Sequence, residues 1–273
     1  MELNEIRTHW DSLAKKHGLD LKSTTKTPTI KQLEINAIAR VISKFLSTAQ
    51  AKSILEVGCG NGHNIFGLIR LFPSFKFLGL DYSDEMIAAA GKLKEELPNC
   101  DLQFDVGDVL HLSDVDEYKN KFDVVFTDRL LINLNTWDLQ RLGLTQLASC
   151  VKEGGFLVLI ENFTQSYANQ NLMRQLINLP PRTPDPYNKF IDETFLEDFV
   201  VKDLNLKLAY SENFGSLHDL LLYVLLPHIN NGKVAYDHPL MESVTSLLER
   251  IPDNFKHDFG NFGQNKLYVF KKQ

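Results

Sequence analysis

The sequence has little cysteine and no long apolar stretch. Its 273 residues include three cysteines, Cys59, Cys100 and Cys150, which are too few and too scattered for a disulfide framework or a zinc site. The longest apolar run, Leu220–Leu226, ends at Pro227 and is far shorter than the roughly 18 to 20 residues of a membrane span. The first residues are charged and lack the apolar segment of a signal peptide. We therefore expect a cytoplasmic protein with no membrane partner.

The sequence also has no basic cluster and no recognisable metal or hydrolase motif. It carries 29 basic and 35 acidic side chains, for a formal charge of −6, whereas a chain that binds nucleic acid over a broad face usually has the opposite excess. Its eight histidines show no metal-ligand spacing, and no G-x-S-x-G nucleophile elbow occurs. These absences predict no nucleic-acid partner and no metal.

What is present is an alternation of short apolar runs and amphipathic segments. The expected strands and helices are strands at 53–57, 75–80, 102–106, 122–127, 156–160, 206–211 and 266–271, and helices at 5–19, 30–47, 64–72, 83–97, 136–151, 164–179, 192–201 and 217–226. We expect Gly154 and Gly155 to stop the helix before them, and Pro227 to end the last helix. Strands that alternate with helices predict an α/β protein with a doubly wound parallel sheet.

The chain is expected to form a single domain over residues 1–273. Its parts are a helical N-terminal cap (1–47), a cofactor-binding core (48–165) and an acceptor-side half with insertions before the last strand (166–273). Trp10 and Leu13 share one face of the first helix, which either packs on the domain or forms a lid over the cofactor. In the second case the polar residues 24–26 would help to close the site.

A glycine-rich turn follows the first strand, in the segment Glu56-Val-Gly-Cys-Gly-Asn-Gly62. Glycine permits a sharp turn and close approach of a ligand, and the helix that follows offers free backbone N–H groups. A dinucleotide-binding loop requires glycine at position 63 or 65, where this sequence has His63 and Ile65. A nicotinamide dehydrogenase is therefore disfavoured. Asp81 lies about 20 residues further on, at the tip of the second strand. An acidic side chain at that position can accept hydrogen bonds from ribose hydroxyls.

Together with Val106-Gly-Asp108-Val109 and the Gly154-Gly155 segment before a strand, this turn resembles the class I S-adenosylmethionine-dependent methyltransferases. The resemblance implies seven strands, six parallel and the last antiparallel, and S-adenosyl-L-methionine as cofactor. The residues that it implies at the cofactor are Glu56, Gly58, Gly60, Gly62, Asn64, Asp81, Tyr82, Met86, Asp108, Val109, Thr127 and Arg129.

Further segments resemble a bacterial subgroup that acts on small molecules, so a small-molecule methyl acceptor is expected. We expect transfer to oxygen rather than nitrogen, with a sugar or surface-polysaccharide precursor among the candidates. A hydroxyl acceptor needs a base, and the candidates are His218, Glu161 and Asp128; a carboxylate needs none. Arg129 and Arg174 are candidates to hold a phosphate or carboxylate of the acceptor.

Several alternatives remain open at this point. An N-methyltransferase, or another S-adenosylmethionine-using enzyme on the same fold, would share every cofactor residue. A non-catalytic cofactor-binding partner protein would share them too, but with a closed acceptor crevice. The sequence also leaves a homo-oligomer open.

Overall fold

The computed structural model describes the whole chain except residues 1, 48–49, 51, 96, 98 and 253–258. Within the described residues, seven strands form one sheet in the order β3-β2-β1-β4-β5-β7-β6. They are β1 (Ser53–Val57), β2 (Lys76–Asp81), β3 (Leu102–Val106), β4 (Phe122–Asp128), β5 (Val151–Asn162), β6 (Leu206–Glu212) and β7 (Asn265–Lys272). Strand β7 is antiparallel to β5 and β6, and the other strands are mutually parallel. The predicted doubly wound sheet with an antiparallel last strand is confirmed.

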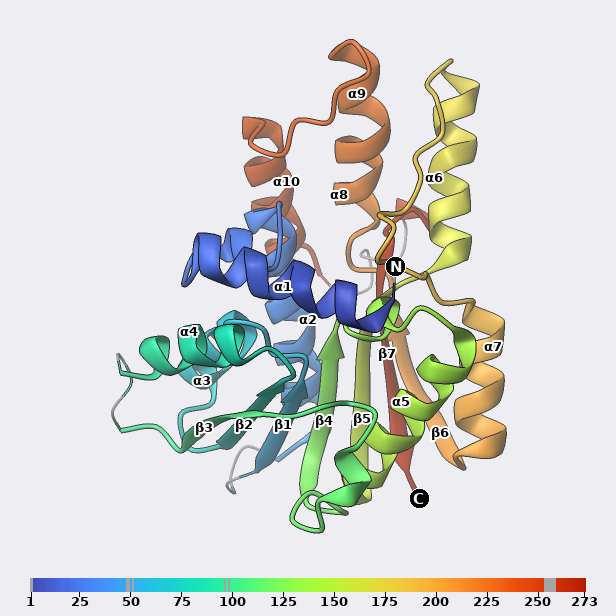
Figure 1. The fold of residues 1–273 in the computed structure, drawn as a ribbon. Coiled ribbons are helices and arrows are strands. Elements are labelled where there is room, and N and C mark those ends of the chain that lie inside the picture. The colour runs from blue at the N-terminus through green and yellow to red at the C-terminus, as the bar shows by residue number, and fades with distance from the viewer. Residues whose placement is uncertain (1, 48–49, 51, 96, 98, 253–258) are drawn as a thin grey trace.

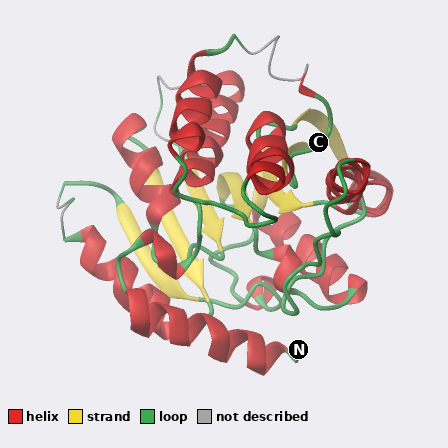
Figure 2. Cartoon of the chain, turned by 90° about the horizontal axis from the view of Figure 1, so that it is seen from above, coloured by secondary structure: helices red, strands yellow, loops and turns green. Residues whose placement is uncertain are grey.

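Helices surround this sheet (Figure 2). The α-helices are α1 (Leu3–His17), α2 (Pro28–Phe45), α3 (His63–Leu71), α4 (Asp84–Lys94), α5 (Trp137–Cys150), α6 (Thr164–Leu176), α7 (Glu193–Asp198), α8 (Ser216–Leu220), α9 (Leu226–Ile229) and α10 (Pro239–Arg250). Short turns η1 (Leu21–Ser23), η2 (Leu112–Asp114) and η3 (Leu131–Asn133) are 3₁₀-helical, and η4 (Phe199–Asp203) and η5 (Leu221–Leu225) are π-helical. Among the described residues, no helix is both long and apolar enough to cross a membrane.

Successive strand residues point to opposite faces of the sheet and build two cores. Ile54 and Val124 pack in the core that includes α2, α3 and α10. Leu55 and Val125 pack in the core that includes α5 and α7. The sheet is therefore buried on both faces, as expected of parallel strands covered by helices.

The strand order determines at which end of the sheet a ligand crevice forms. The chain leaves β1 toward β2 on one side, while β4 and β5 lie on the other, so a crevice forms at the carboxyl ends of β1 and β4. Helices α6, α8, α9 and α10 rise beyond these strand ends, and α1 lies across the same end of the sheet (Figure 1).

The structure corrects three local expectations. The helix α5 ends at Cys150, and β5 begins at Val151 with both glycines inside it; Gly154 has φ +75° and lies in an irregularity of the β4–β5 register, where glycine suits a bulge. Pro227 does not end the helical segment, because it stands in the first turn of α9, directly after η5, where a helix needs no N–H donor. Helix α10 was not predicted at all.

Candidate active site

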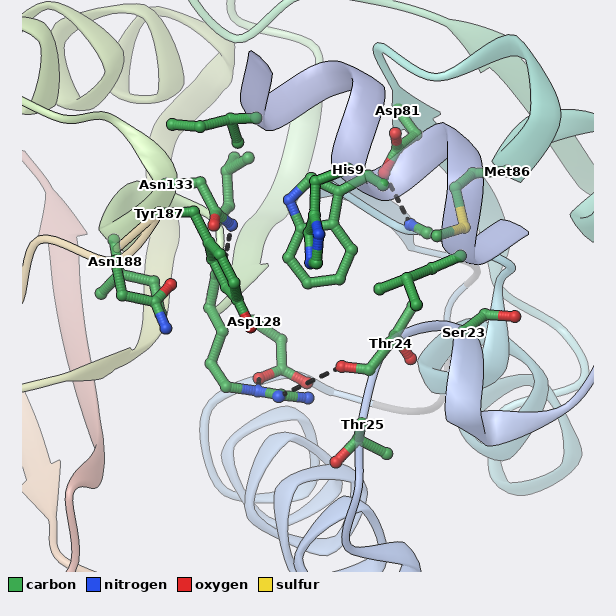
Figure 3. Close-up of a pocket in the computed structure, with 18 of the residues that line it drawn as sticks. His9, Ser23, Thr24, Thr25, Asp81, Met86, Asp128, Asn133, Tyr187 and Asn188 are labelled. Carbon is green, nitrogen blue, oxygen red and sulfur yellow. Dashed lines mark hydrogen bonds and ion pairs between the residues drawn. The ribbon is translucent and has the colours of Figure 1, made fainter. Parts of the chain in front are cut away.

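A cavity of about 890 Å³ lies at the carboxyl ends of the parallel strands. Its walls come from α1, the segment that links α1 to α2, the turn after β1, the ends of β2 and β4, residues 182–188 and helix α8 with the turn after it. Figure 3 shows Asp81 and Met86 at one end of this cavity, and Tyr187 and Asn188 at the other, with His9 between them. We call the first end the cofactor half and the second the acceptor half.

The glycine turn after β1 adopts a backbone that other residues resist. Gly58, Gly60 and Gly62 all have positive φ, at 75°, 53° and 86°, a region that favours glycine. The N–H groups of Gly58 and Cys59 donate to the carbonyl of Leu80 at 2.7 and 2.9 Å, which fixes the turn against β2. A Cβ atom at Gly60 would lie 2.7 Å from Cγ2 of Thr24. The turn therefore keeps backbone open to the cavity on one side and packs against the cap on the other.

Asp81 lies at the end of β2, where its carboxylate meets this turn. One oxygen accepts from the N–H of Gly60 at 2.8 Å and the other from the N–H of Ser83 at 3.0 Å. Ser83 caps α4 by accepting from the N–H of Met86, so Asp81 is not needed as the cap. Burial raises the pKa of Asp81 to about 6 despite these two hydrogen bonds. A carboxylate offers more acceptor sites than these two bonds use, so Asp81 has capacity left for hydroxyl groups.

The other residues expected at the cofactor divide into two groups. Those that line the cavity are Gly58, Gly60, Asn64, Asp81, Tyr82, Met86, Asp108, Val109 and Arg129. Three do not line it: Glu56 and Thr127 are fully buried behind it, and Gly62 packs on Phe104 and Ala90. The side chain of Thr127 donates to Glu161 at 2.9 Å, and Glu56 accepts from Asn64 at 2.7 Å. These three therefore support the walls of the cavity from behind.

A buried charged cluster of Lys31, Glu34, Asp128 and Arg129 forms the floor between the two halves. Lys31 pairs with Glu34 at 2.7 Å and with Asp128, and Arg129 Nε lies 3.1 Å from Glu34 and 3.3 Å from Asp128. Although burial opposes ionisation, Lys31 and Arg129 hold the pKa of Asp128 well below its usual range. Asp128 is therefore an ionised, paired group and a poor base. Arg129 has φ +59°, which marks a strained backbone held by its surroundings.

Glu161 and His218, the other expected bases, do not line the cavity. Glu161 is fully buried and accepts from Thr127 and from three successive backbone N–H groups, at positions 130, 131 and 132. It shapes the turn after β4, and burial raises its pKa to about 7. His218 is fully buried, with Nε2 3.0 Å from Oγ1 of Thr29 and Nδ1 2.9 Å from Asp219. It ties α8 to the start of α2, so its position argues against a role as base.

The cap covers the cavity and contacts the core at several points. On α1, Arg7 pairs with Asp84 at 3.2 Å and Lys15 with Glu85 at 3.4 Å, both on α4. The side chain of Asn61, within the glycine turn, donates to backbone carbonyls just after α1. Trp10, Leu13 and residues 24–26 line the cavity. The cap therefore packs on the domain and also lines the cavity, a position that both alternatives for the first helix share.

His9 on α1 is a cavity residue that the sequence analysis missed. Its ring stacks on Tyr187 with centroids 4.4 Å apart and meets Trp10 edge-on at 5.2 Å. The net effect of its surroundings is to lower the pKa of His9. Burial is the largest cause and Lys26 adds to it, whereas Asp185 opposes them. The ring is therefore neutral near pH 7. A histidine beside a tryptophan on an amphipathic helix gives no sequence signal of this role.

Buried polar atoms without a hydrogen-bond partner gather at the cavity. Of the described residues, those that line it and carry such an atom are His9, Asn61, Asn133, Asn162, Asn188 and Asn265. Buried polar groups are normally satisfied, so this set is suited to polar ligands. With Asp81 and the open glycine turn, it fits a cofactor that carries ribose hydroxyls, an amino group and a carboxylate.

Comparison with known sequences defines the class of protein. The methyltransferase domain family matches residues 49–186, and the chain belongs to this family, whose cofactor is S-adenosylmethionine. Among curated proteins, trans-aconitate 2-methyltransferase of Deinococcus radiodurans is 30% identical over 143 residues, which cover 52% of this chain and 50% of the relative. The chain thus aligns with only about half the length of that relative.

Solved structures confirm the fold. Magnesium protoporphyrin IX methyltransferase from Synechocystis, with bound S-adenosylhomocysteine, has a TM-score of 0.55 and 14% identity, over 89% of this chain and 83% of that one. Geranyl diphosphate C-methyltransferase from Streptomyces coelicolor has a TM-score of 0.52 and 16% identity, over 87% and 79%. These enzymes act on chemically different acceptors, so the likeness identifies no acceptor.

Proposed function

We propose that the chain transfers a methyl group from S-adenosylmethionine to a carboxylate oxygen of a small organic acid. The observation that carries this proposal is that none of the three bases expected from the sequence is placed to take a proton from an acceptor in the cavity. Asp128 is paired with two cations, and Glu161 and His218 are buried away from the cavity. A carboxylate is already nucleophilic and needs no base, whereas a hydroxyl does. The name of the relative trans-aconitate 2-methyltransferase, which refers to an organic acid, agrees with this.

The residues of the cofactor half have distinct tasks in this proposal. Asp81 accepts hydrogen bonds from the ribose, Asp108 and Val109 contact the adenine, and the turn at Gly58 and Gly60 receives the amino-acid end. When bound, the cofactor supplies a methyl group on a positively charged sulfur. The chain itself orients the acceptor and excludes water, and such orientation contributes up to roughly 7–11 kcal/mol in favourable cases.

A hydroxyl acceptor is the second candidate, and His9 is the observation that favours it. Its Nε2 atom is buried and unpartnered within the described structure, and its ring faces the acceptor half. A neutral imidazole there could take the hydroxyl proton as the bond to the methyl group forms. The sugar acceptors considered from the sequence belong to this second candidate.

A labelling experiment separates the two candidates. The protein is incubated with methyl-labelled S-adenosylmethionine and a set of small organic acids that includes trans-aconitate, or a metabolite extract. A methyl ester releases labelled methanol in mild alkali, whereas a methyl ether or a methylated amine keeps the label. Alkali-labile label is expected, and alkali-stable label would overturn the carboxylate proposal. The Asp81→Ala variant serves as the control for labelling that does not depend on the cofactor site.

A further inference from the structure

We propose that Arg182 binds a carboxylate or phosphate group of the acceptor, distinct from the oxygen that is methylated. This inference rests on the proposed methyl transfer, because it assigns the acceptor half of the same cavity. The proposal also requires that the acceptor carry a second anionic group besides the one that is methylated. Arg129, Arg174 and Arg182 differ in what their guanidinium groups contact.

The arginines suggested by the sequence are already engaged. Arg129 lines the cavity, but its guanidinium is paired with Glu34 and Asp128. Arg174 is buried, does not line the cavity, and donates to the carbonyls of Pro180 and Tyr223. Arg182 lines the cavity, and no described carboxylate forms an ion pair with it. Within the described part of the chain, its positive charge therefore has no ion-pair partner.

Arg182 is nevertheless held in a defined orientation by neutral groups. Its Nη1 donates to Oε1 of Gln170 at 2.7 Å and to Oε1 of Gln264 at 3.2 Å. The amide nitrogen of Gln170 is itself used by Asp219 and by the carbonyl of Phe262, so the oxygen of Gln170 must face the arginine. Gln170 is fully buried, and this fixes one edge of the guanidinium while leaving its other donors for a ligand.

Aromatic rings complete the support of Arg182. The guanidinium lies 3.6 Å from the ring centroid of Tyr223 and 5.1 Å from that of Tyr167. Stacking on a ring orients the planar fork without neutralising its charge. The nearby acids Asp219 and Asp185 accept hydrogen bonds from other groups, and within the described residues neither forms an ion pair with Arg182. A flat, oriented guanidinium with donors left for a ligand is the arrangement that binds planar anions through two donors.

The segment that carries Arg182 is anchored independently of this side chain. The backbone N–H of Arg182 donates to Oδ1 of Asn171 at 2.8 Å, and its carbonyl accepts from Nδ2 of Asn171 at 3.0 Å. Replacement of the side chain should therefore leave the segment in place, so a variant at this position tests binding rather than folding.

The test uses calorimetry on protein saturated with S-adenosylhomocysteine. The probes are trans-aconitate, inorganic phosphate and the neutral trimethyl ester of trans-aconitate. For Arg182→Gln, we expect trans-aconitate to bind about 10- to 100-fold more weakly, as for loss of hydrogen bonds to a charged group. The neutral ester should not distinguish the variant from the native protein. Arg141→Gln is the matched control, since Arg141 also stacks on a ring, that of Phe199, but lies outside the cavity.

The outcomes distinguish a carboxylate ligand from a phosphate ligand. They also distinguish failure of the Arg182 inference from failure of the proposed methyl transfer. Displacement of trans-aconitate by millimolar phosphate would assign a site that also takes phosphate groups, and no displacement would assign a carboxylate site. Equal anion affinity in native and Arg182→Gln protein, or no anion binding to native protein, would overturn the inference. Weaker S-adenosylhomocysteine binding in Arg182→Gln would also overturn it, because Arg182 would then hold the cofactor's own carboxylate. If native protein bound no S-adenosylhomocysteine, the proposed function itself would fail.

Discussion

The two halves of the cavity are built in different ways. The cofactor half comes from strand ends and the turns directly after them, where backbone N–H groups donate to Asp81 and to the carbonyl of Leu80 and fix the turn. The acceptor half comes from side chains on α1, on the segment 182–188, on α8 and at the start of β7. Among the described residues, the Oδ1 atoms of Asn133, Asn162 and Asn188 in this half have no hydrogen-bond partner.

This difference indicates what each half is built to do. A backbone turn whose shape depends on glycine accepts one ligand geometry and changes little with side-chain substitution. Separate side chains on several elements can be exchanged one by one, which suits the part of a site that sets specificity. We therefore expect the two halves to be energetically separate.

The largest effect is expected at Gly60. Gly60→Val should abolish S-adenosylhomocysteine binding in calorimetry, because φ is +53° and a Cβ would lie 2.7 Å from Thr24. Gly91→Val is the matched control, since a Cβ there meets nothing within 4 Å and φ is ordinary. Circular dichroism should show both variants folded. Cofactor binding that survived in Gly60→Val would place the ligand away from this turn.

Asp81 should show the next largest effect. Asp81→Ala should weaken S-adenosylhomocysteine binding by about 1.5–3 kcal/mol, the range for hydrogen bonds to a charged group. The interaction requires the carboxylate, whose pKa burial raises to about 6. Lowering the pH from 7 to 5 protonates this group, so the affinity of native protein should fall over that interval. Asp81→Asn should remove most of this pH dependence, and an unchanged pH profile in the variant would exclude Asp81 as its source.

The contrast between the halves also explains which parts of the site could be predicted from the sequence. Gly58, Gly60 and Asp81 each follow an apolar strand at a fixed spacing, so local patterns revealed both the sheet and the cofactor half. His9 and Arg182 reach the cavity only through tertiary packing of distant segments, and neither has a local signal. His218 was selected for its imidazole chemistry, but its burial against Thr29 depends on a contact 189 residues away. Local chemistry alone could not decide which side chains face the acceptor.

His218 should therefore behave as a structural residue. His218→Ala should lower the free energy of unfolding by about 1–3 kcal/mol, because it leaves Thr29 and Asp219 with lost partners in a buried site. Denaturant titration measures this, with exposed His228→Ala as the control. Cofactor affinity of the folded variant should be unchanged. A stability equal to that of native protein, combined with a large loss of methyl transfer, would return His218 to the catalytic role expected from the sequence.

The smallest effect is expected at His9, and it sharpens the choice between the two acceptor chemistries. With a carboxylate acceptor no proton is removed, so His9→Gln should lower kcat by less than about tenfold, through lost stacking on Tyr187. With a hydroxyl acceptor the same change should lower kcat by about 10²–10⁴-fold. In that case the native pH profile should also show one ionisation below the usual histidine range, because burial lowers the pKa of His9. Exposed His111→Gln is the control. A large loss that added imidazole restores would establish His9 as the base and replace the carboxylate proposal with the hydroxyl one.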